Sequence, residues 1–160
     1  MSEDRYETGL RIRREVLGAD YVNTSISMSD DFNRPLQELV TEYCWGAVWS
    51  RPGLTRKMRS LINLAMLTAL NRPHEVKLHL KGALNNGCSR EEIMEVLLQT
   101  AIYCGVPAAI DSFRLAREIL NENIERGRIQ VGIPVKLGFH SRPSLLVAKI
   151  VQYYGGEVNL

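Results

Sequence analysis

The chain contains few of the residues that build disulfide-rich or redox-active proteins. Of its 160 residues only three are cysteines, and the histidines and phenylalanines also number three each. The cysteines are odd in number, widely spaced and without a C-x-x-C pair, which argues against a disulfide framework. They are Cys44, Cys88 and Cys104. We therefore expect a cytoplasmic protein.

Charge and hydrophobicity are not concentrated in any one segment either. The formal net charge is +2, and there is no basic stripe of the kind that binds nucleic acid. The longest apolar run, residues 61–70, is interrupted by Asn63 and Thr68 and is too short to cross a bilayer. These absences predict no nucleic-acid partner and no membrane partner, whereas a hydrophobic share of 45% predicts an ordinary folded core.

The spacing of apolar residues predicts an all-helical domain over most of the chain. Helices are expected at about residues 4–17, 32–49, 56–70, 73–87, 90–103 and 107–124. Thr55 is a predicted N-cap, and Ser89 with Glu92 forms an S-x-x-E capping box. The polar residues 23–31 are expected to connect the first two helices.

Two of the predicted helices carry more apolar surface than one small bundle buries easily. Residues 61–70 are apolar nearly all round, as in a helix buried at the centre of a bundle or in a subunit interface. The helix at residues 32–49 has one apolar side, formed by Phe32, Leu36, Leu39, Val40 and Tyr43. It also carries the large aromatic pair Trp45 and Trp49, which adds to the apolar surface that must be buried. We therefore expect a homo-oligomer.

The pattern changes after Gly127. Residues 129–137 alternate between apolar and other residues as in a half-buried strand, and an amphipathic stretch from Pro143 to about Tyr154 predicts a short helix. Residues 157–160 begin another expected strand. The sequence thus predicts a helical domain over residues 1–127, followed by a short β-α-β tail over residues 128–160.

Three segments of the helical domain carry a resemblance to a known family. They read WGAVWSRPGLTRKMRSL (45–61), LHLKGALNNG (78–87) and REEIMEVLLQTAIYCGVPAA (90–109). With these segments, residues 1–127 closely resemble the 4-carboxymuconolactone decarboxylase family. The resemblance implies an all-α fold that forms homo-trimers or homo-hexamers. It also implies loss of CO2 from a carboxylated lactone in protocatechuate breakdown, with no metal and no organic cofactor.

The wider superfamily includes alkylhydroperoxidase-like proteins, which carry C-x-x-C-x-x-x-H on the corresponding helix. In this chain the histidine of that motif is His79, and the two cysteine positions hold Arg72 and Glu75. Without a thiol pair there is no dithiol–disulfide couple. The departure favours the decarboxylase over the peroxidase.

The residues at these positions suit a decarboxylation. Arg72, Glu75 and His79 are spaced i, i+3 and i+7 and so project from one helical face. We take His79 and Glu75 as candidate catalytic residues, since a proton must be returned to carbon. Arg59 and Arg72 are candidate carboxylate anchors, because a guanidinium binds a carboxylate bidentately. Trp49 is a further candidate for substrate binding.

Each of these residues also has an ordinary structural interpretation. His79 can be a structural histidine of a helix, and Glu75 with His79 an i, i+4 surface pair. The charges at residues 56–59 can form a solvated face. Trp45 and Trp49, spaced i and i+4, fit core or interface aromatics better than substrate-stacking residues.

The tail carries a second, incomplete resemblance. The segment GFHSRPS (138–144) with the following helix resembles the start of the histidine-containing phosphocarrier (HPr) of the sugar phosphotransferase system. The resemblance implies phosphorylation of His140, which precedes a helix N-terminus that favours anions. Only the first β-α-β portion is present, and a piece of this size lacks the area to fold alone. We therefore favour a remnant over a working phosphocarrier.

Three alternatives to a decarboxylase remain at this point. One is a thiol-dependent antioxidant enzyme, which the missing C-x-x-C pair disfavours. Another is a non-enzymatic helical oligomer, which would be favoured if no buried polar pocket lay beside His79. The third is a phosphotransfer or regulatory module that acts through His140.

Overall fold

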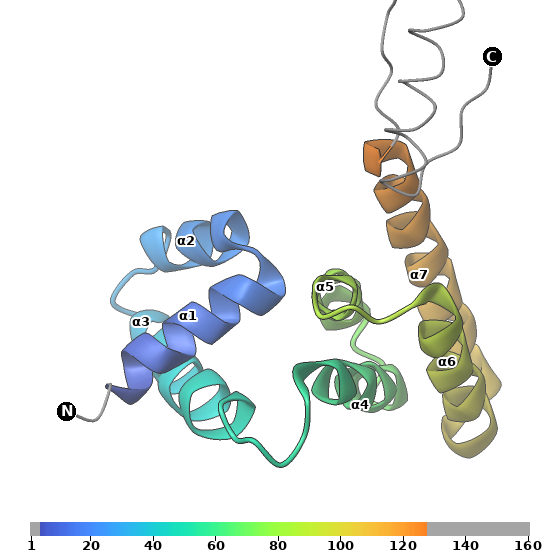
Figure 1. The fold of residues 1–160 in the computed structure, drawn as a ribbon, viewed down its shortest axis with the longest axis horizontal. Helices are drawn as coiled ribbons and strands as arrows, with labels where there is room; N and C mark the ends of the chain where they lie inside the picture. The colour runs from blue at the N-terminus through green and yellow to red at the C-terminus, as the bar shows by residue number, and fades with distance from the viewer. Residues whose placement is uncertain (1–3, 128–160) are drawn as a thin grey trace, which may run out of the picture. The chain divides into compact units, whose positions relative to one another are not determined.

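The computed structural model describes residues 4–127, which are helical with no strand among them (Figure 1). This confirms the predicted all-α domain, whereas the predicted β-α-β tail lies outside the described residues. The helices are α1 (Arg5–Leu17), α2 (Ala19–Ser27), α3 (Arg34–Leu39), the π-helical η1 (Val40–Trp49), α4 (Arg56–Ala69), α5 (Pro73–Asn85), α6 (Arg90–Cys104) and α7 (Val106–Gly127).

Local capping residues set several helix ends, and the predicted caps at Thr55 and at Ser89 with Glu92 are confirmed. Asp4 caps α1 with its side chain, and Thr55 does the same for α4. Gly18 ends α1 with φ of 94°, a backbone conformation that glycine adopts without strain. At α6 the capping box is complete: the Ser89 amide donates to Glu92 Oε2 at 2.7 Å, and the Glu92 amide donates to Ser89 Oγ at 3.2 Å.

One prediction about the first fifty residues is wrong, and a second is correct only in part. The expected connection at residues 23–31 is helical up to Ser27. Val22 is the one buried side chain of α2, so no apolar stripe in the sequence indicates this helix. The expected helix at residues 32–49 begins at Arg34 and changes to a π-helix at Val40. Apolar spacing does not distinguish the two helix types clearly, since both present a face every three to five residues.

The first core cluster lies in the N-terminal region, among α1, α2 and η1. Two glycines bring α1 and η1 into backbone contact there: a Cβ at Gly9 would lie 2.0 Å from the Thr41 carbonyl oxygen, and one at Gly46 would lie 2.2 Å from the Arg5 carbonyl oxygen. No larger residue fits at either position. The buried members of the cluster are Leu10, Ile12, Val16, Leu17, Val22, Trp45 and Trp49.

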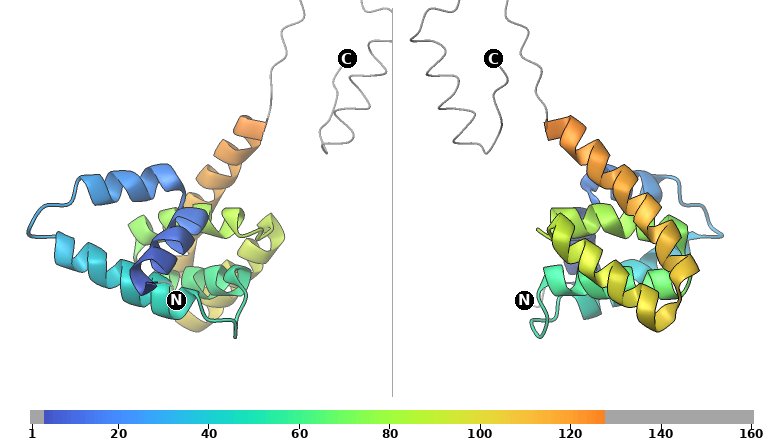
Figure 2. Two further views of the ribbon diagram at one scale, coloured as in Figure 1. Left: turned by 60° about the vertical axis from the view of Figure 1, so that its left-hand side comes forward. Right: turned by 90° about the vertical axis from the view of Figure 1, so that its right-hand side faces the viewer.

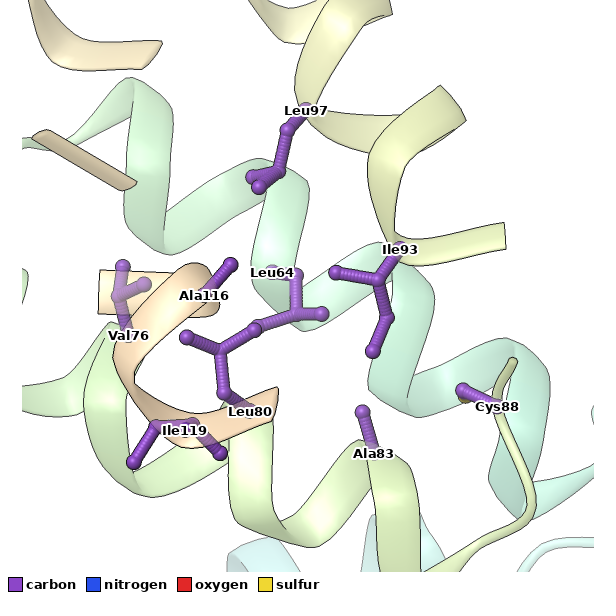
Figure 3. Packing of buried hydrophobic residues seen from close by; sticks show 9 residues of the cluster. All are labelled: Leu64, Val76, Leu80, Ala83, Cys88, Ile93, Leu97, Ala116 and Ile119. Carbon is purple, nitrogen blue, oxygen red and sulfur yellow. The ribbon is translucent and has the colours of Figure 1, made fainter. Parts of the chain in front are cut away.

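The second core cluster fills the space among α4, α5, α6 and α7 (Figure 3). Figure 2 shows α6 and α7 packed side by side. Leucine, isoleucine and alanine dominate this cluster, which is the composition of a well-packed helical core. Its buried members are Leu64, Val76, Leu80, Ala83, Cys88, Ile93, Leu97, Ala116 and Ile119.

Helix α5 joins the two clusters, because it packs against α1 on one side and against α4 and α7 on the other (Figure 1). Asn85 Nδ2 at the end of α5 donates to the Val16 carbonyl of α1 at 2.8 Å. An ion pair between Arg56 and Glu15 ties α4 to α1. This arrangement brings the His79 helix to the edge of the N-terminal cluster.

Apolar side chains remain exposed on both regions. Most of the predicted apolar side of residues 32–49 faces solvent, with Phe32 94% exposed, whereas Val40 packs against the N-terminal cluster. Trp45 and Trp49 are buried within the single chain, so this pair needs no subunit interface to cover it. On α4, Leu64 is fully buried while Met58, Ile62 and Met66, at intervals of four residues, are exposed. Within the single chain, residues 61–70 are therefore buried on one face only.

Candidate functional site

His79 lies where the two core clusters meet. Its neighbours on α5, Val76 and Leu80, are buried in the C-terminal cluster. The His79 ring instead lies parallel to the indole of Trp45 on η1, with 6.4 Å between ring centroids and 4° between planes. Trp45 in turn packs against Trp49, with centroids 4.7 Å apart and planes tilted by 31°. The three rings form one continuous aromatic group, which we call the His79 stack.

The imidazole of His79 is held in an apolar environment with one nitrogen unused. Its Nδ1 atom is buried and has no hydrogen-bond partner within residues 4–127. Burial lowers the pKa of His79 below its ordinary value of 6.5, and the negative charge of Glu75 opposes that shift. A buried nitrogen without a partner costs free energy, so a ligand that bonds to it would be favoured.

The other predicted residues of α5 line its exposed start. Glu75 is exposed in the first turn, one turn before His79, and acts on the imidazole through its charge. Arg72 is the exposed N-cap residue and makes no capping hydrogen bond with its side chain. It precedes His79 by seven residues, or about 10 Å of helix axis, so one elongated molecule could reach both.

Arg59 is half-buried at the start of α4 and is only partly hydrogen-bonded. Its Nη2 donates to the Arg51 carbonyl at 3.0 Å, which fixes the guanidinium against the loop before α4. Its Nε is buried and has no partner among the described residues. A buried guanidinium nitrogen without an acceptor fits a residue that receives a carboxylate.

The structure brings together part of the predicted set. Contacts join Trp49 and His79 through Trp45, and Glu75 acts on His79 by charge. Trp49 is only 5% exposed, so most of its surface serves the core. Sequence reasoning assigned Trp45 to the core and missed its stacking on His79, because the contact joins helices more than thirty residues apart and leaves no local pattern.

A separate cavity of about 440 Å³ lies between α6 and α7. Its size is typical of small-molecule sites, and its charged lining residues are all arginines: Arg90, Arg114 and Arg117. None of the predicted site residues lines it. The cavity is therefore a second place where an anion could bind, so a test of His79 needs a control substitution in this cavity.

The cysteines show no arrangement for thiol chemistry. Cys44 and Cys104 are exposed, Cys88 is buried, and none forms a disulfide. Burial raises the pKa of the Cys88 thiol, which disfavours the reactive thiolate. In the described part of the chain, no three His, Cys, Asp or Glu side chains gather as a metal site. None of the described helices has the length and hydrophobicity needed to span a membrane.

Comparisons with known proteins agree on one family. A family model described as the carboxymuconolactone decarboxylase family matches residues 34–118. The chain is 42% identical over 120 residues to a 4-carboxymuconolactone decarboxylase of Acinetobacter baylyi, covering 75% of this chain and 90% of that protein. It is 40% identical over 122 residues to a nitrosuccinic acid decarboxylase of Metarhizium robertsii, covering 76% and 85%. The family match ends at residue 118, so the phosphocarrier resemblance of the tail stays a prediction.

Proposed function

The chain belongs to the carboxymuconolactone decarboxylase family, and from this premise we propose that it removes CO2 from 4-carboxymuconolactone or a closely related carboxylated lactone. The product is the corresponding enol-lactone, and the reaction uses no metal and no organic cofactor. The observation that carries the proposal is His79, whose buried and unpartnered nitrogen lies in an apolar stack beside the charge of Glu75.

The reaction needs one electron sink and one proton. When the bond to the carboxylate breaks, CO2 leaves and the electron pair moves through the ring double bond to the lactone carbonyl, which becomes an oxyanion. An imidazolium at His79 then donates its proton to the ring carbon, and the resulting imidazole takes a replacement proton from solvent. The apolar surroundings strengthen the attraction between the imidazolium and the developing oxyanion.

The lowered pKa of His79 fits this role once substrate charge is considered. In the free protein burial favours the neutral imidazole. A bound carboxylated lactone adds negative charge nearby, which raises the pKa of His79 and favours the protonated form that the reaction needs. We expect kcat/KM to fall as the pH rises through a pKa below 6.5, because that parameter reports the free enzyme.

Two arginines are proposed to hold the substrate. Arg59 has a buried Nε without an acceptor, which suits a carboxylate that enters beside α4. Arg72 stands exposed at the start of the helix that carries His79, and would contact a second carboxylate. Trp49 is proposed to act on the substrate only through Trp45, since it is almost fully buried.

The similarity to a nitrosuccinic acid decarboxylase supports a second substrate class. A nitro group beside the carboxylate accepts the electron pair as the lactone carbonyl does, and a proton is again returned to carbon. Both substrates are carboxylated small molecules with an adjacent electron sink. The same His79 and arginines would serve either one, so the choice between them depends on the shape of the site.

The direct test is to measure CO2 release from 4-carboxymuconolactone and, in parallel, from nitrosuccinic acid. We expect His79→Gln to lower kcat roughly 10²-fold or more, with the helical content unchanged. Arg59→Lys should mainly raise KM, because lysine lacks the bidentate fork. Arg117→Gln serves as the matched control, since Arg117 lines the other cavity and should leave both constants unchanged.

The outcomes distinguish the two possible locations of the reaction, the His79 stack and the cavity between α6 and α7. If His79→Gln is inactive and Arg117→Gln is fully active, the proton donor lies at the His79 stack. If His79→Gln is fully active while Arg117→Gln is not, the chemistry takes place between α6 and α7 and the proposal is wrong. If the wild-type protein releases no CO2 from either compound, the proposed substrate classes are wrong.

A further inference from the structure

The segment that carries Trp45 and Trp49 has an unusual helical register. η1 is π-helical over ten residues, Val40–Trp49, so its hydrogen bonds span five residues instead of four. Each turn holds more than the roughly 3.6 residues of an α-helix, and its side chains therefore point in directions that an α-helix would not give. π-Helical segments are rare and usually occupy a single turn at functional sites. A run of this length requires contacts that hold it.

Arg13 of α1 makes such contacts at the junction where α3 becomes η1. Its Nη1 donates to Thr41 Oγ1 at 3.0 Å, in the first turn of η1, and its Nη2 donates to Gln37 Oε1 at 2.9 Å, in α3. Gln37 and Thr41 are four residues apart, so the two arms of one guanidinium span the change of register. Ser25 Oγ of α2 donates to the same Gln37 oxygen at 3.4 Å.

The burial of Arg13 is costly and its contacts do not include a carboxylate. The side chain is only 5% exposed, its Nε has no partner within residues 4–127, and both of its acceptors are neutral. Burial lowers the pKa of Arg13, while Tyr21, Tyr6 and Cys44 oppose the shift. A buried ion without a counter-ion destabilises a fold, so an apolar residue would serve stability better.

Thr41 is also held through its backbone. It is fully buried, and Gly9 lies so close to it that a Cβ there would be 2.0 Å from the Thr41 carbonyl oxygen. The side chain of Thr41 is thus fixed by Arg13 and its carbonyl by the close approach of α1. Trp45 follows Thr41 by one turn, and its ring is the one that stacks on His79.

We propose that Arg13 is a positioning residue of the candidate site: its guanidinium fixes the register of η1 and so holds the Trp45 ring parallel to His79. The structural part of this inference stands by itself, and its consequence for catalysis rests on the proposed function. Loss of the two guanidinium hydrogen bonds of Arg13 allows η1 to relax toward an α-helical register. Trp45 then rotates away from His79, which becomes more exposed to water.

The test replaces Arg13 by methionine, which keeps much of the apolar volume, and compares it with Arg14→Met. Arg14 is the adjacent residue of α1, is exposed, and donates to Asn23 Oδ1 at 2.9 Å. The first readout is the exciton couplet that the closely packed Trp45 and Trp49 indoles give in circular dichroism, calibrated with Trp49→Phe. The second is the titration of His79 followed by NMR, assigned with His79→Gln. The third is kcat.

We expect Arg13→Met to lose most of the couplet, to move the His79 titration up toward 6.5, and to lower kcat roughly 10- to 100-fold, the scale of an ångström-size misplacement. Arg14→Met should match the wild type in all three. Thr41→Val removes one acceptor while keeping the side-chain shape, and should shift the three readouts in the same direction by less. It also tests the proposal if Arg13→Met does not fold.

The outcomes distinguish this inference from the proposed function. The couplet and the titration need no substrate, so their change in Arg13→Met supports the positioning role even if the wild type releases no CO2. If the wild type is active and folded Arg13→Met keeps the couplet, the titration and kcat, Arg13 does not position the stack. Equal changes in Arg14→Met would also overturn the inference, because a general loosening of α1 would explain them.

Discussion

The N-terminal region, α1 to η1, and the C-terminal region, α4 to α7, bury their polar groups in different ways. In the C-terminal region the buried polar side chains are hydroxyls that find hydrogen-bond partners inside that region, as in the 2.9 Å hydrogen bond between Thr68 of α4 and Ser112 of α7. The N-terminal region buries the guanidinium of Arg13, which has only neutral acceptors. The first arrangement stabilises a core, whereas the second fixes a geometry at a cost in stability.

The same difference appears in the backbone packing. The C-terminal helices meet through leucine and isoleucine side chains, while α1 and η1 meet through Gly9 and Gly46. Side-chain packing tolerates small adjustments, but backbone contact allows none without separating the helices. We infer that the C-terminal region supplies most of the stability and that the N-terminal region sets the position of Trp45 beside His79.

The largest expected effect on stability is therefore in the C-terminal core. Leu64 is fully buried among four helices, and Leu64→Ala should lower the free energy of unfolding by about 2–5 kcal/mol through lost burial and a cavity. Leu98→Ala is the matched control, because Leu98 on α6 is 46% exposed and its loss should cost far less. Urea unfolding of both variants measures the difference, and equal midpoints would contradict the assignment of the core.

The next effect is expected where α1 meets η1. Gly9→Ala places a methyl group against backbone atoms that cannot move aside, and we expect a loss of about 1–3 kcal/mol, typical of overpacking. Unlike Leu64→Ala, it should also weaken the Trp45–Trp49 couplet. Gly53→Ala introduces the same methyl group where no atom lies within 4 Å, and should change neither quantity. A stable Gly9→Ala protein with the full couplet would show that the two backbones are not in contact.

A smaller effect on stability depends on pH and arises at His79, between the two regions. Its pKa is lowered in the folded chain, so the unfolded chain binds more protons at mildly acidic pH. The stability that depends on a neutral His79 is fully present above pH 6.5, the ordinary pKa of histidine. It is lost as the pH falls from there through the lower pKa of His79 in the folded chain.

Thermal unfolding measured from pH 7.5 downward, a range chosen to start about one pH unit above the ordinary value, should therefore show stability that decreases on acidification. His79→Gln should reduce that slope, because glutamine does not titrate. His74→Gln removes an exposed imidazole from the same helix and should retain the slope. An unchanged slope in His79→Gln would mean that the His79 ring is not buried in solution.

The regions also differ in how far the sequence predicted them. The starts of α4 and α6 follow from Thr55 and the Ser89–Glu92 box, because capping is local chemistry. The π-register of η1 and the stacking of Trp45 on His79 were not predicted, since both depend on contacts with distant helices. A family motif located His79, but its burial and its unused nitrogen are properties of the fold.

Association should depend on the exposed apolar residues of both regions. We expect a homo-oligomer, since Phe32 and the α4 face of Met58, Ile62 and Met66 are exposed in the single chain. A trimer or a hexamer is the assembly that the family resemblance implies. Phe32→Glu and Met66→Glu compare the two regions: each should change the unfolding of a monomer by less than about 0.5 kcal/mol, yet reduce the assembly size. Light scattering measures the mass, and a monomeric wild-type protein at micromolar concentration would contradict the prediction.

The smallest effect is expected from removal of the tail. Both core clusters and every residue of the His79 stack lie within residues 4–127, so a chain that ends at Gly127 retains the contacts that stabilise and position the site. Deletion of residues 128–160 should leave kcat, KM and the Trp45–Trp49 couplet unchanged. Incubation of the full chain with phosphoenolpyruvate and the donor enzyme of the phosphotransferase system tests the other possibility. Acid-labile phosphate on His140 would overturn the remnant interpretation, and loss of decarboxylation on truncation would show that the tail contributes to the site.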